Sequence, residues 1–182
     1  MWKKIIVVVL IVSIVLFGAF FIVAYTTPTA YTVEKEVTIN KPKAETFAYL
    51  KMLKNSSEWT PWPRRDPAMK TEYRGTDGQP GFVSSWKGTT SETGEGEQEI
   101  KRVVEGERID TEIRFKEPWE SKADAYISTE STGENQTKVK WGLKGEFPRP
   151  MNVFLLFMDM DQAIGKDLSE GLTNLKTIME SK

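Results

Sequence analysis

Acid–base chemistry in this chain must come from Asp, Glu, Lys or Tyr, or from a bound water, because its 182 residues contain no His and no Cys. The same two absences exclude a Ser-His-Asp triad, a thiol nucleophile, a disulfide and an imidazole or thiolate ligand for zinc. Asp159, Asp161 and Asp167 fall in a predicted C-terminal helix. Residues two apart on a helix diverge by about 200°, so Asp159 and Asp161 do not converge on one ion. We therefore expect no metal site and no cofactor.

Two tryptophans stand out in the segment SEWTPWPRRDPAMK, residues 57–70, where Trp59 and Trp62 lie three apart among three prolines. Indole rings supply a large apolar area together with one polar N–H, and the prolines stiffen the segment that presents them. Two interpretations are open: the indoles gate the mouth of a ligand cavity, or they plug the end of the fold. Arg64, Arg65 and Asp66 are interpreted as a solvated or ion-paired turn rather than an anion clamp, because exposed charge clusters are common.

The N-terminal segment has the pattern of a membrane anchor. Residues 5–25 carry no charge, and 21 residues are about the length that a helix needs to cross the hydrocarbon core. Lys3 and Lys4 precede this run, so the positive-inside rule predicts a cytoplasmic N-terminus and a domain on the extracytoplasmic side. A cleaved signal peptide is the alternative, but the run is longer than usual and no small-x-small site follows it. We expect a single-pass protein with an anchor and linker at 1–30 and a folded domain at 31–182.

The charges of the whole chain nearly cancel. There are 25 Lys and Arg against 26 Asp and Glu, which gives a formal net charge of −1. Such a balance produces no long-range field for a polyanion, so nucleic acid is not expected as a partner.

The spacing of apolar residues along the chain predicts the strands and helices that position these residues. Residues 31–39 alternate as a half-buried strand, and a helix is predicted within 40–53. Turn signals then recur about every ten residues, which predicts about six antiparallel strands. From Met151 to about Glu180 apolar residues recur every three or four positions, the mark of one long helix. The order predicts an α+β fold in which a curved antiparallel sheet of about seven strands wraps the long C-terminal helix.

A cavity is expected where the helix does not fill the concave side of this sheet. Candidate lining residues share the inward parity of their strands, lie on the C-terminal helix, or belong to the tryptophan segment. They are Trp59, Trp62, Phe82, Ser84, Trp86, Gln98, Arg102, Thr111, Phe115, Trp141 and Phe157. The plain interpretation of the apolar members is ordinary core. The strand containing Gln98 and Arg102 has two possible registers, because Val103 and Val104 fit either face.

Four stretches of the chain resemble one family. TFAYLKMLKNSSEWTPW followed by DPAMKTEYRG, then GFVSSWKG, and finally MDMDQAIGKDLSEGLTNLK are similar to the polyketide cyclase/dehydrase-like branch of the START-like (SRPBCC) superfamily. The resemblance runs from about Val33 to Lys176. It implies a helix-grip fold with a deep apolar cavity. The well-studied relatives bind lipids, sterols, polyketides or other hydrophobic molecules.

The resulting hypothesis is a membrane-anchored domain that binds a hydrophobic small molecule or a lipid. One alternative is an enzyme of the cyclase, dehydratase or hydrolase type that uses the same cavity, although binding alone is favoured. The other is an interaction module whose cavity is filled by its own aromatic side chains.

Overall fold

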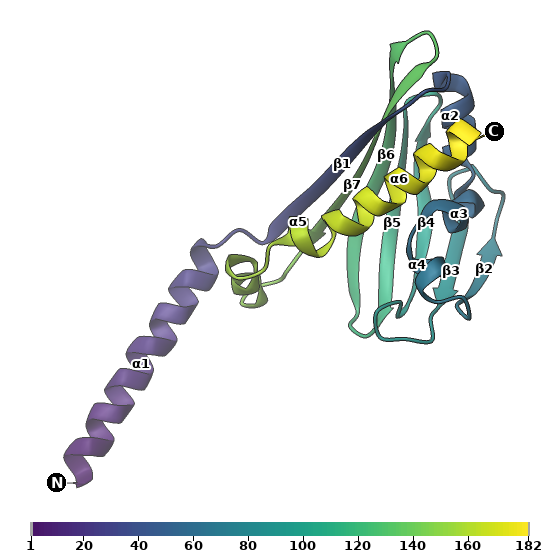
Figure 1. The fold of residues 1–182 in the computed structure, drawn as a ribbon. Coiled ribbons are helices and arrows are strands. Elements are labelled where there is room, and N and C mark those ends of the chain that lie inside the picture. Colours follow the sequence, from purple (N-terminus) through teal and green to yellow (C-terminus); the bar gives the residue numbers. More distant parts are fainter. Residues whose placement is uncertain (1, 182) are drawn as a thin grey trace. The chain divides into compact units, whose positions relative to one another are not determined.

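The structure is a computed structural model that describes residues 2–181 of the chain (Figure 1). It begins with the helix α1 (Trp2–Thr26). Strands in the described residues are β1 (Ala30–Ile39), β2 (Lys70–Arg74), β3 (Val83–Lys87), β4 (Glu95–Val104), β5 (Arg108–Glu117), β6 (Ser121–Gly133) and β7 (Gln136–Glu146). The other helices are α2 (Lys43–Lys51), η1 (Leu53–Asn55), α3 (Ser56–Trp59), α4 (Trp62–Arg65), η2 (Met151–Leu156), α5 (Met160–Ala163) and α6 (Gly165–Ser181).

The described residues form two compact units. One unit consists of α1, the residues that follow it up to Tyr31, and the segment Glu146–Asp159. The other runs from Thr32 to Gly145 and resumes at Met160, so it contains nearly the whole sheet together with α5 and α6.

Helix α1 meets the requirements of a membrane span. Its 25 residues rise about 37 Å at 1.5 Å per residue, which exceeds the roughly 30 Å of the hydrocarbon core. The mean hydropathy of its most apolar window is 3.3, and none of that window is buried in the protein. By length and composition α1 is therefore a candidate span, and a signal sequence fits the same description.

A seven-stranded sheet forms the larger unit, in the order β1-β7-β6-β5-β4-β3-β2 (Figure 1). Strands β2 to β7 pair antiparallel with their neighbours in sequence, as the regular turn spacing predicts. β1 lies beside β7, so the first and last strands in sequence are neighbours and the two edges of the sheet are β1 and β2. The predicted curved antiparallel sheet is confirmed.

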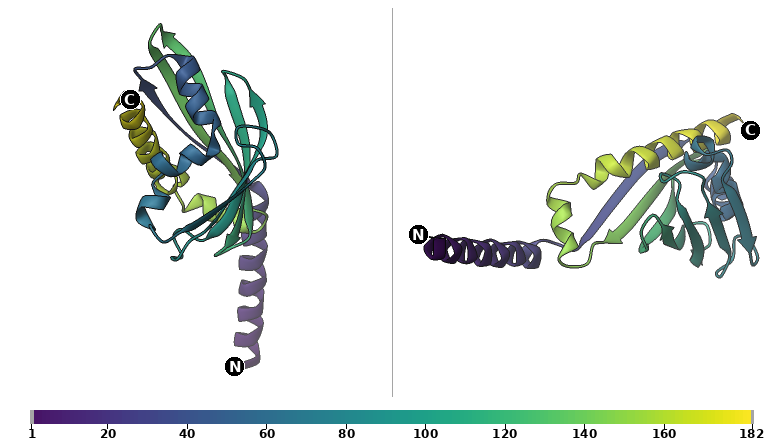
Figure 2. Two further views of the ribbon diagram at one scale, coloured as in Figure 1. Left: turned by 90° about the vertical axis from the view of Figure 1, so that its right-hand side faces the viewer. Right: turned by 90° about the horizontal axis from the view of Figure 1, so that it is seen from below.

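Helix α6 lies across one face of this sheet, which two of the views in Figures 1 and 2 show. Leu168, Leu172, Leu175 and Met179 are buried, and their spacing of four, three and four residues makes a single apolar stripe on the helix. The sheet residues beneath it are apolar and buried as well, among them Ile39, Ile100, Val139 and Leu143. The predicted helix-grip arrangement is thus confirmed.

The C-terminal helix is shorter than predicted. Residues 151–156 form the 3-10 helix η2, the chain leaves helical geometry at residues 158–159, and α5 and α6 follow with an interruption at Ile164. The sequence MNVFLLFM (151–158) is almost continuously apolar, so it has no stripe that would align it with the sheet. It belongs instead to the unit that contains α1.

Candidate functional site

The tryptophan segment consists of two single helical turns. Trp59 ends α3 and Trp62 begins α4, with Thr60 and Pro61 as the connection. The Thr60 amide and hydroxyl both donate to the carbonyl oxygen of Ser56, at 2.9 and 2.7 Å, which closes the first turn. The rigid turns fix the direction in which each indole leaves the backbone.

Both indoles meet a third one from the sheet. The ring centroids of Trp59 and Trp141 are 4.8 Å apart at 77°, and those of Trp62 and Trp141 are 6.0 Å apart at 86°. These edge-to-face arrangements are favoured by the ring quadrupoles. Trp59 is only 3% exposed, whereas Trp62 is half-buried. Trp59 therefore packs as core, and Trp62 keeps part of its surface open to solvent.

Helix α6 has a glycine where the tryptophans approach. A Cβ on Gly171 would lie 2.8 Å from Cζ3 of Trp141 and 3.4 Å from two ring atoms of Trp59. The glycine thus lets the helix backbone lie directly against two indoles. Its position in the middle of α6 is explained by this close packing, although glycine costs the helix about 1 kcal/mol relative to alanine.

The two arginines that follow Trp62 fasten α4 to α6. Arg65 Nη2 lies 2.8 Å from Oδ1 of Asp167 and 2.6 Å from Oε2 of Glu170. The hydrogen bond to Asp167, followed by that to Glu170, raises the pKa of Arg65. Arg64 donates to Oδ1 of Asn174 at 3.1 Å. These residues are ion-paired or hydrogen-bonded side chains that hold the tryptophan segment in place.

Asp66 connects the same segment to the turn between β3 and β4. Its carboxylate accepts hydrogen bonds from the Thr89 amide at 2.6 Å, the Thr89 hydroxyl at 2.8 Å and the Thr93 hydroxyl at 2.8 Å. The Thr89 backbone bond, with the hydroxyl bonds beside it, holds the pKa of Asp66 below its ordinary value. Asp66 itself is buried, so the expectation that it lies in a solvated turn is wrong. No local sequence pattern indicates this contact, because Thr89 and Thr93 lie more than twenty residues from Asp66.

Most of the predicted lining residues share one face of the sheet. Strand register places Trp86 opposite Gly96, and Gly96 opposite Phe115. The next row consists of Ser84, Gln98 and Ile113. Thr111 and Trp141 belong to further rows of the same face, which faces α6.

This inner face has a fully buried part and a half-buried part. Phe82, Thr111 and Trp141 are buried, so they belong to the core. The half-buried part, which we call the inner strip, contains Ser84, Trp86, Gln98, Ile113 and Phe115.

Contacts within the inner strip hold its side chains in place. The Trp86 ring lies close over Gly96 and meets Phe115 edge-on at 6.1 Å, and its Nε1 donates to the carbonyl oxygen of Thr93 at 3.0 Å. Gln98 Nε2 donates to the Thr111 hydroxyl at 2.9 Å. The strip is thus a mostly apolar surface with an amide and a hydroxyl among the aromatic rings. Whether it contacts a ligand stays a prediction.

Arg102 is not on this face. The β4–β5 pairing shifts register between Ile100 and Arg102, and Arg102 lies opposite Asp110, whose neighbours Ile109 and Thr111 are the buried residues. Arg102 is exposed. A β-bulge of this kind adds one residue to the strand and so reverses the alternation beyond it. The predicted inward orientation of Arg102 is therefore wrong.

Phe157 does not line the inner face either. It follows η2, is 84% exposed, and belongs to the unit of α1 rather than to the unit of the sheet. The prediction assigned it to the stripe of α6 because an apolar residue three positions before Met160 continues that stripe.

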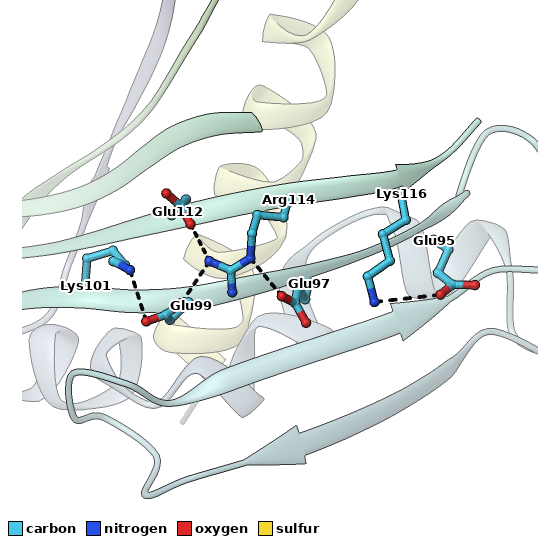
Figure 3. A network of polar contacts seen from close by, with 7 residues as sticks. All are labelled: Glu95, Glu97, Glu99, Lys101, Glu112, Arg114 and Lys116. Atoms are coloured by element: carbon cyan, nitrogen blue, oxygen red, sulfur yellow. Dashed lines mark hydrogen bonds and ion pairs between the residues drawn. The ribbon is translucent and has the colours of Figure 1, made fainter. Parts of the chain in front are cut away.

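The opposite face of the sheet carries a network of charged side chains (Figure 3). Arg114 contacts Glu97 at 2.7 Å and Glu99 at 2.8 Å, and it also pairs with Glu112. Hydrogen bonds from Arg114 lower the pKa of Glu99 and Glu112. Lys101 adds a contact of 3.1 Å to Glu99. Each of these carboxylates is paired with a cation, so ion pairing explains why they cluster on this face of the sheet. Among the described residues, no group of three or more His, Cys, Asp or Glu is arranged to hold a metal ion.

One hollow of about 290 Å³ lies at the turn between β3 and β4 and the end of β5. Its lining is rich in backbone and hydroxyl groups and consists of Gly88, Thr89, Thr90, Ser91, Gly94, Glu117 and Pro118. This volume is near the lower limit for small-molecule sites, and the lining contains no aromatic, Leu, Ile, Val or Met side chain. The inner strip is the better candidate for an apolar ligand.

Comparison with solved structures confirms the fold. The crystal structure of Ara h 8.0201 has a TM-score of 0.57 and 21% identity, and the match covers 84% of this chain and 99% of that one. A solution structure from Thermobifida fusca has a TM-score of 0.62 and 15% identity, over 82% of this chain and 93% of that one. A putative uncharacterized protein from Rhizobium leguminosarum has a TM-score of 0.60 and 14% identity, over 84% and 96%.

No curated protein matches the chain significantly. The family model described as "Polyketide cyclase / dehydrase and lipid transport" matches residues 30–180, which is nearly everything after α1. The chain therefore belongs to this family of the START-like superfamily, as its tryptophan segment and C-terminal helix had indicated.

Proposed function

We propose that this protein binds a hydrophobic small molecule or a lipid on the inner strip of its sheet, and that α1 anchors it in a membrane. The observation that carries the proposal is the strip itself. Trp86, Ile113 and Phe115 share a face with buried core residues, yet they are only half-buried. An apolar surface of this kind is stabilised when an apolar ligand covers it.

The chemistry of the strip favours a ligand with an apolar body and few polar groups. Trp86 and Phe115 offer aromatic surface, and Gln98 and Ser84 offer an amide and a hydroxyl on the neighbouring row. None of the five side chains of the strip is an acid or a base near neutral pH, so the strip itself supports binding rather than catalysis. Membership of a family described by polyketide cyclisation and lipid transport agrees with a hydrophobic ligand.

Contacts at the end of α1 support an anchor that is retained rather than cleaved. Ala24 and Thr27 are buried, and their carbonyl oxygens accept hydrogen bonds from the side-chain amide of Asn152 at 2.7 and 2.8 Å. Arg149 donates to the carbonyl oxygens of Ala24 and Tyr25. Cleavage after Thr26 would remove the Ala24 acceptor and leave the fully buried Asn152 amide with only one of its two hydrogen bonds, at a cost of about 1–3 kcal/mol.

The binding proposal is tested with the full chain in detergent micelles, by titration with a fluorescent lipid analogue. Phe115→Ala should raise the Kd by roughly tenfold or more, because loss of a large apolar contact removes about 1.5–3 kcal/mol. Lys116→Ala, on the next residue of the same strand and exposed, is the matched control and should leave the Kd unchanged. Native mass spectrometry of the protein purified from its own membrane would identify the molecule that binds.

Equal affinity of wild type, Phe115→Ala and Trp86→Ala, with cooperative thermal unfolding in all three, would contradict a ligand on the inner strip. That result would favour the alternative of an interaction module with a filled interior. Trp59 and Trp141 support this alternative in part, because they occupy the space between the sheet and Gly171 of α6.

A further inference from the structure

An exposed apolar surface lies on the segment Met151–Met158, which we call the interfacial segment. Five of its eight side chains are large, apolar and between 45% and 84% exposed: Met151, Phe154, Leu156, Phe157 and Met158. No charged residue interrupts these eight positions. Large apolar side chains gathered in this way on a protein surface mark a contact with a membrane or with another protein.

The segment is fixed to the last turn of α1 within one compact unit. Asn152, at its second position, is completely buried and donates both side-chain hydrogen bonds to the end of α1, at Ala24 and Thr27. The last carbonyl oxygens of a helix have no partners inside the helix, so Asn152 acts as their cap. Arg149, just before the segment, donates to Ala24 and Tyr25 and places its guanidinium 5.1 Å from the centre of the Tyr25 ring.

These contacts set the depth of the segment once α1 spans a membrane. The uncharged run that ends at Tyr25 is about as long as the hydrocarbon core is thick, so the last turn of α1 lies at the boundary between hydrocarbon and headgroups. Tyr and Arg are residues that settle at this boundary, with an apolar part in the lipid and a polar end in water. Side chains hydrogen-bonded to Ala24 and Tyr25 must lie at the same level.

We propose that the interfacial segment lies in the surface of the same bilayer that α1 spans, with Phe154, Leu156 and Phe157 inserted among the lipids. This inference rests on the proposed anchoring by α1. The lipid surface is the occupant that the observations favour, because α1 itself brings that surface to the segment. The chain would then meet the membrane twice, once before β1 and once between β7 and α5.

The test uses the full chain in vesicles of phosphatidylcholine and phosphatidylglycerol. The chain has no Cys, so a single Phe157→Cys substitution can carry one environment-sensitive fluorophore, and the exposed side chain makes this change compatible with folding. Lipids spin-labelled near the headgroup should reduce the fluorescence more than lipids spin-labelled near the end of the acyl chain. Leu156→Cys repeats the measurement at a second exposed position of the segment.

Phe17→Cys, in the middle of α1, is the reference for depth and should be quenched most by the deep spin label. Quenching at Phe17 with none at Phe157 and Leu156 would overturn the inference and leave the anchor intact. No quenching at Phe17 would overturn the anchor and, with it, this inference. A label at Phe157 that is shielded from water yet insensitive to both lipids would indicate a protein partner or a second copy, and would also overturn the inference.

Discussion

At the scale of single residues, the two tryptophans of the opening motif have different surroundings. Trp59 is buried against Trp141 and Gly171, whereas Trp62 touches Trp141 and keeps a partly open surface. Of the two interpretations made from the sequence, the packing of Trp59 is that of a plug, and a gating role stays a proposal for Trp62.

We predict that Trp59→Ala lowers the free energy of unfolding by about 3–5 kcal/mol, because it removes a buried indole from a rigid cluster. Trp62→Ala should cost about 1–2 kcal/mol, since part of that ring is already solvated. If Trp62 lies at the entrance to the ligand-binding site, its removal should also change the affinity for a lipid analogue. Urea unfolding and titration of the two variants separate these effects. Equal destabilisation by both changes, with unaltered affinity, would refute a gating role for Trp62.

Asp66 gives a second prediction at this scale, on the dependence of stability on pH. Its folded-state pKa is lowered, chiefly by the Thr89 amide. The stabilisation is therefore fully present above the unfolded pKa, near 3.9, and is lost as the pH falls through the lower folded pKa. Asp66→Asn should be less stable than wild type at neutral pH, and the two stabilities should converge on acidification below about pH 4.

Thermal unfolding midpoints of wild type and Asp66→Asn measured from pH 7 to pH 3 test this expectation. Asp124→Asn changes an exposed carboxylate on the opposite face of the sheet and is the matched control. A constant difference between wild type and Asp66→Asn at every pH would show that the ionised carboxylate contributes nothing beyond its shape.

At the scale of secondary-structure elements, α6 depends on a residue that is unfavourable for a helix. Gly171→Ala would improve helix propensity by about 1 kcal/mol, but the new Cβ would lie 2.8 Å from the Trp141 ring. Overpacking of this kind costs about 1–3 kcal/mol, and we expect a net loss of stability. Ser169→Ala, at an exposed position of the same helix, should instead raise stability by a few tenths of a kcal/mol. Equal gains in the free energy of unfolding of both variants, measured by urea unfolding, would contradict this expectation. They would show that α6 can shift enough to relieve the contact between the new Cβ and the Trp141 ring.

The elements were predictable from the sequence wherever periodicity was regular. Alternation in residues 108–117 and 136–146 gave the correct inner face, because a strand with one buried side repeats every two residues. Arg102 was misassigned because the bulge beside it reverses the alternation. Val103 and Val104 fit either face, so the sequence carries no signal of that reversal. The segment 151–158 was misassigned because it is apolar at nearly every position, so it has no periodicity that would show where the helix stripe begins. Contacts such as Asp66 with Thr89 depend on tertiary structure and have no local signal.

At the scale of the whole molecule, the fold and the orientation in a membrane rest on observations of different kinds. The fold after α1 is established by the family match over residues 30–180 and by solved structures that share it. Orientation in a membrane rests only on Lys3 and Lys4 before the apolar run. The domain boundary at residue 31 likewise stays a prediction, and the unit that contains α1 includes residues 146–159 from far along the chain.

Topology provides the last prediction: the N-terminus is cytoplasmic and the folded domain lies on the other side. A single Cys at Ser121, the exposed first residue of β6, should react with a membrane-impermeant thiol reagent in intact cells. A single Cys at Trp2, which is 81% exposed at the opposite end of α1, is the control and should react only after lysis, because the positive-inside rule keeps the Lys3 and Lys4 end in the cytoplasm. The reverse pattern of labelling would contradict the orientation. Recovery of the Ser121-labelled protein in a soluble fraction, at a mass that lacks α1, would instead show that the helix is a cleaved signal. Asn152 would then lose its acceptor at Ala24 in the mature protein.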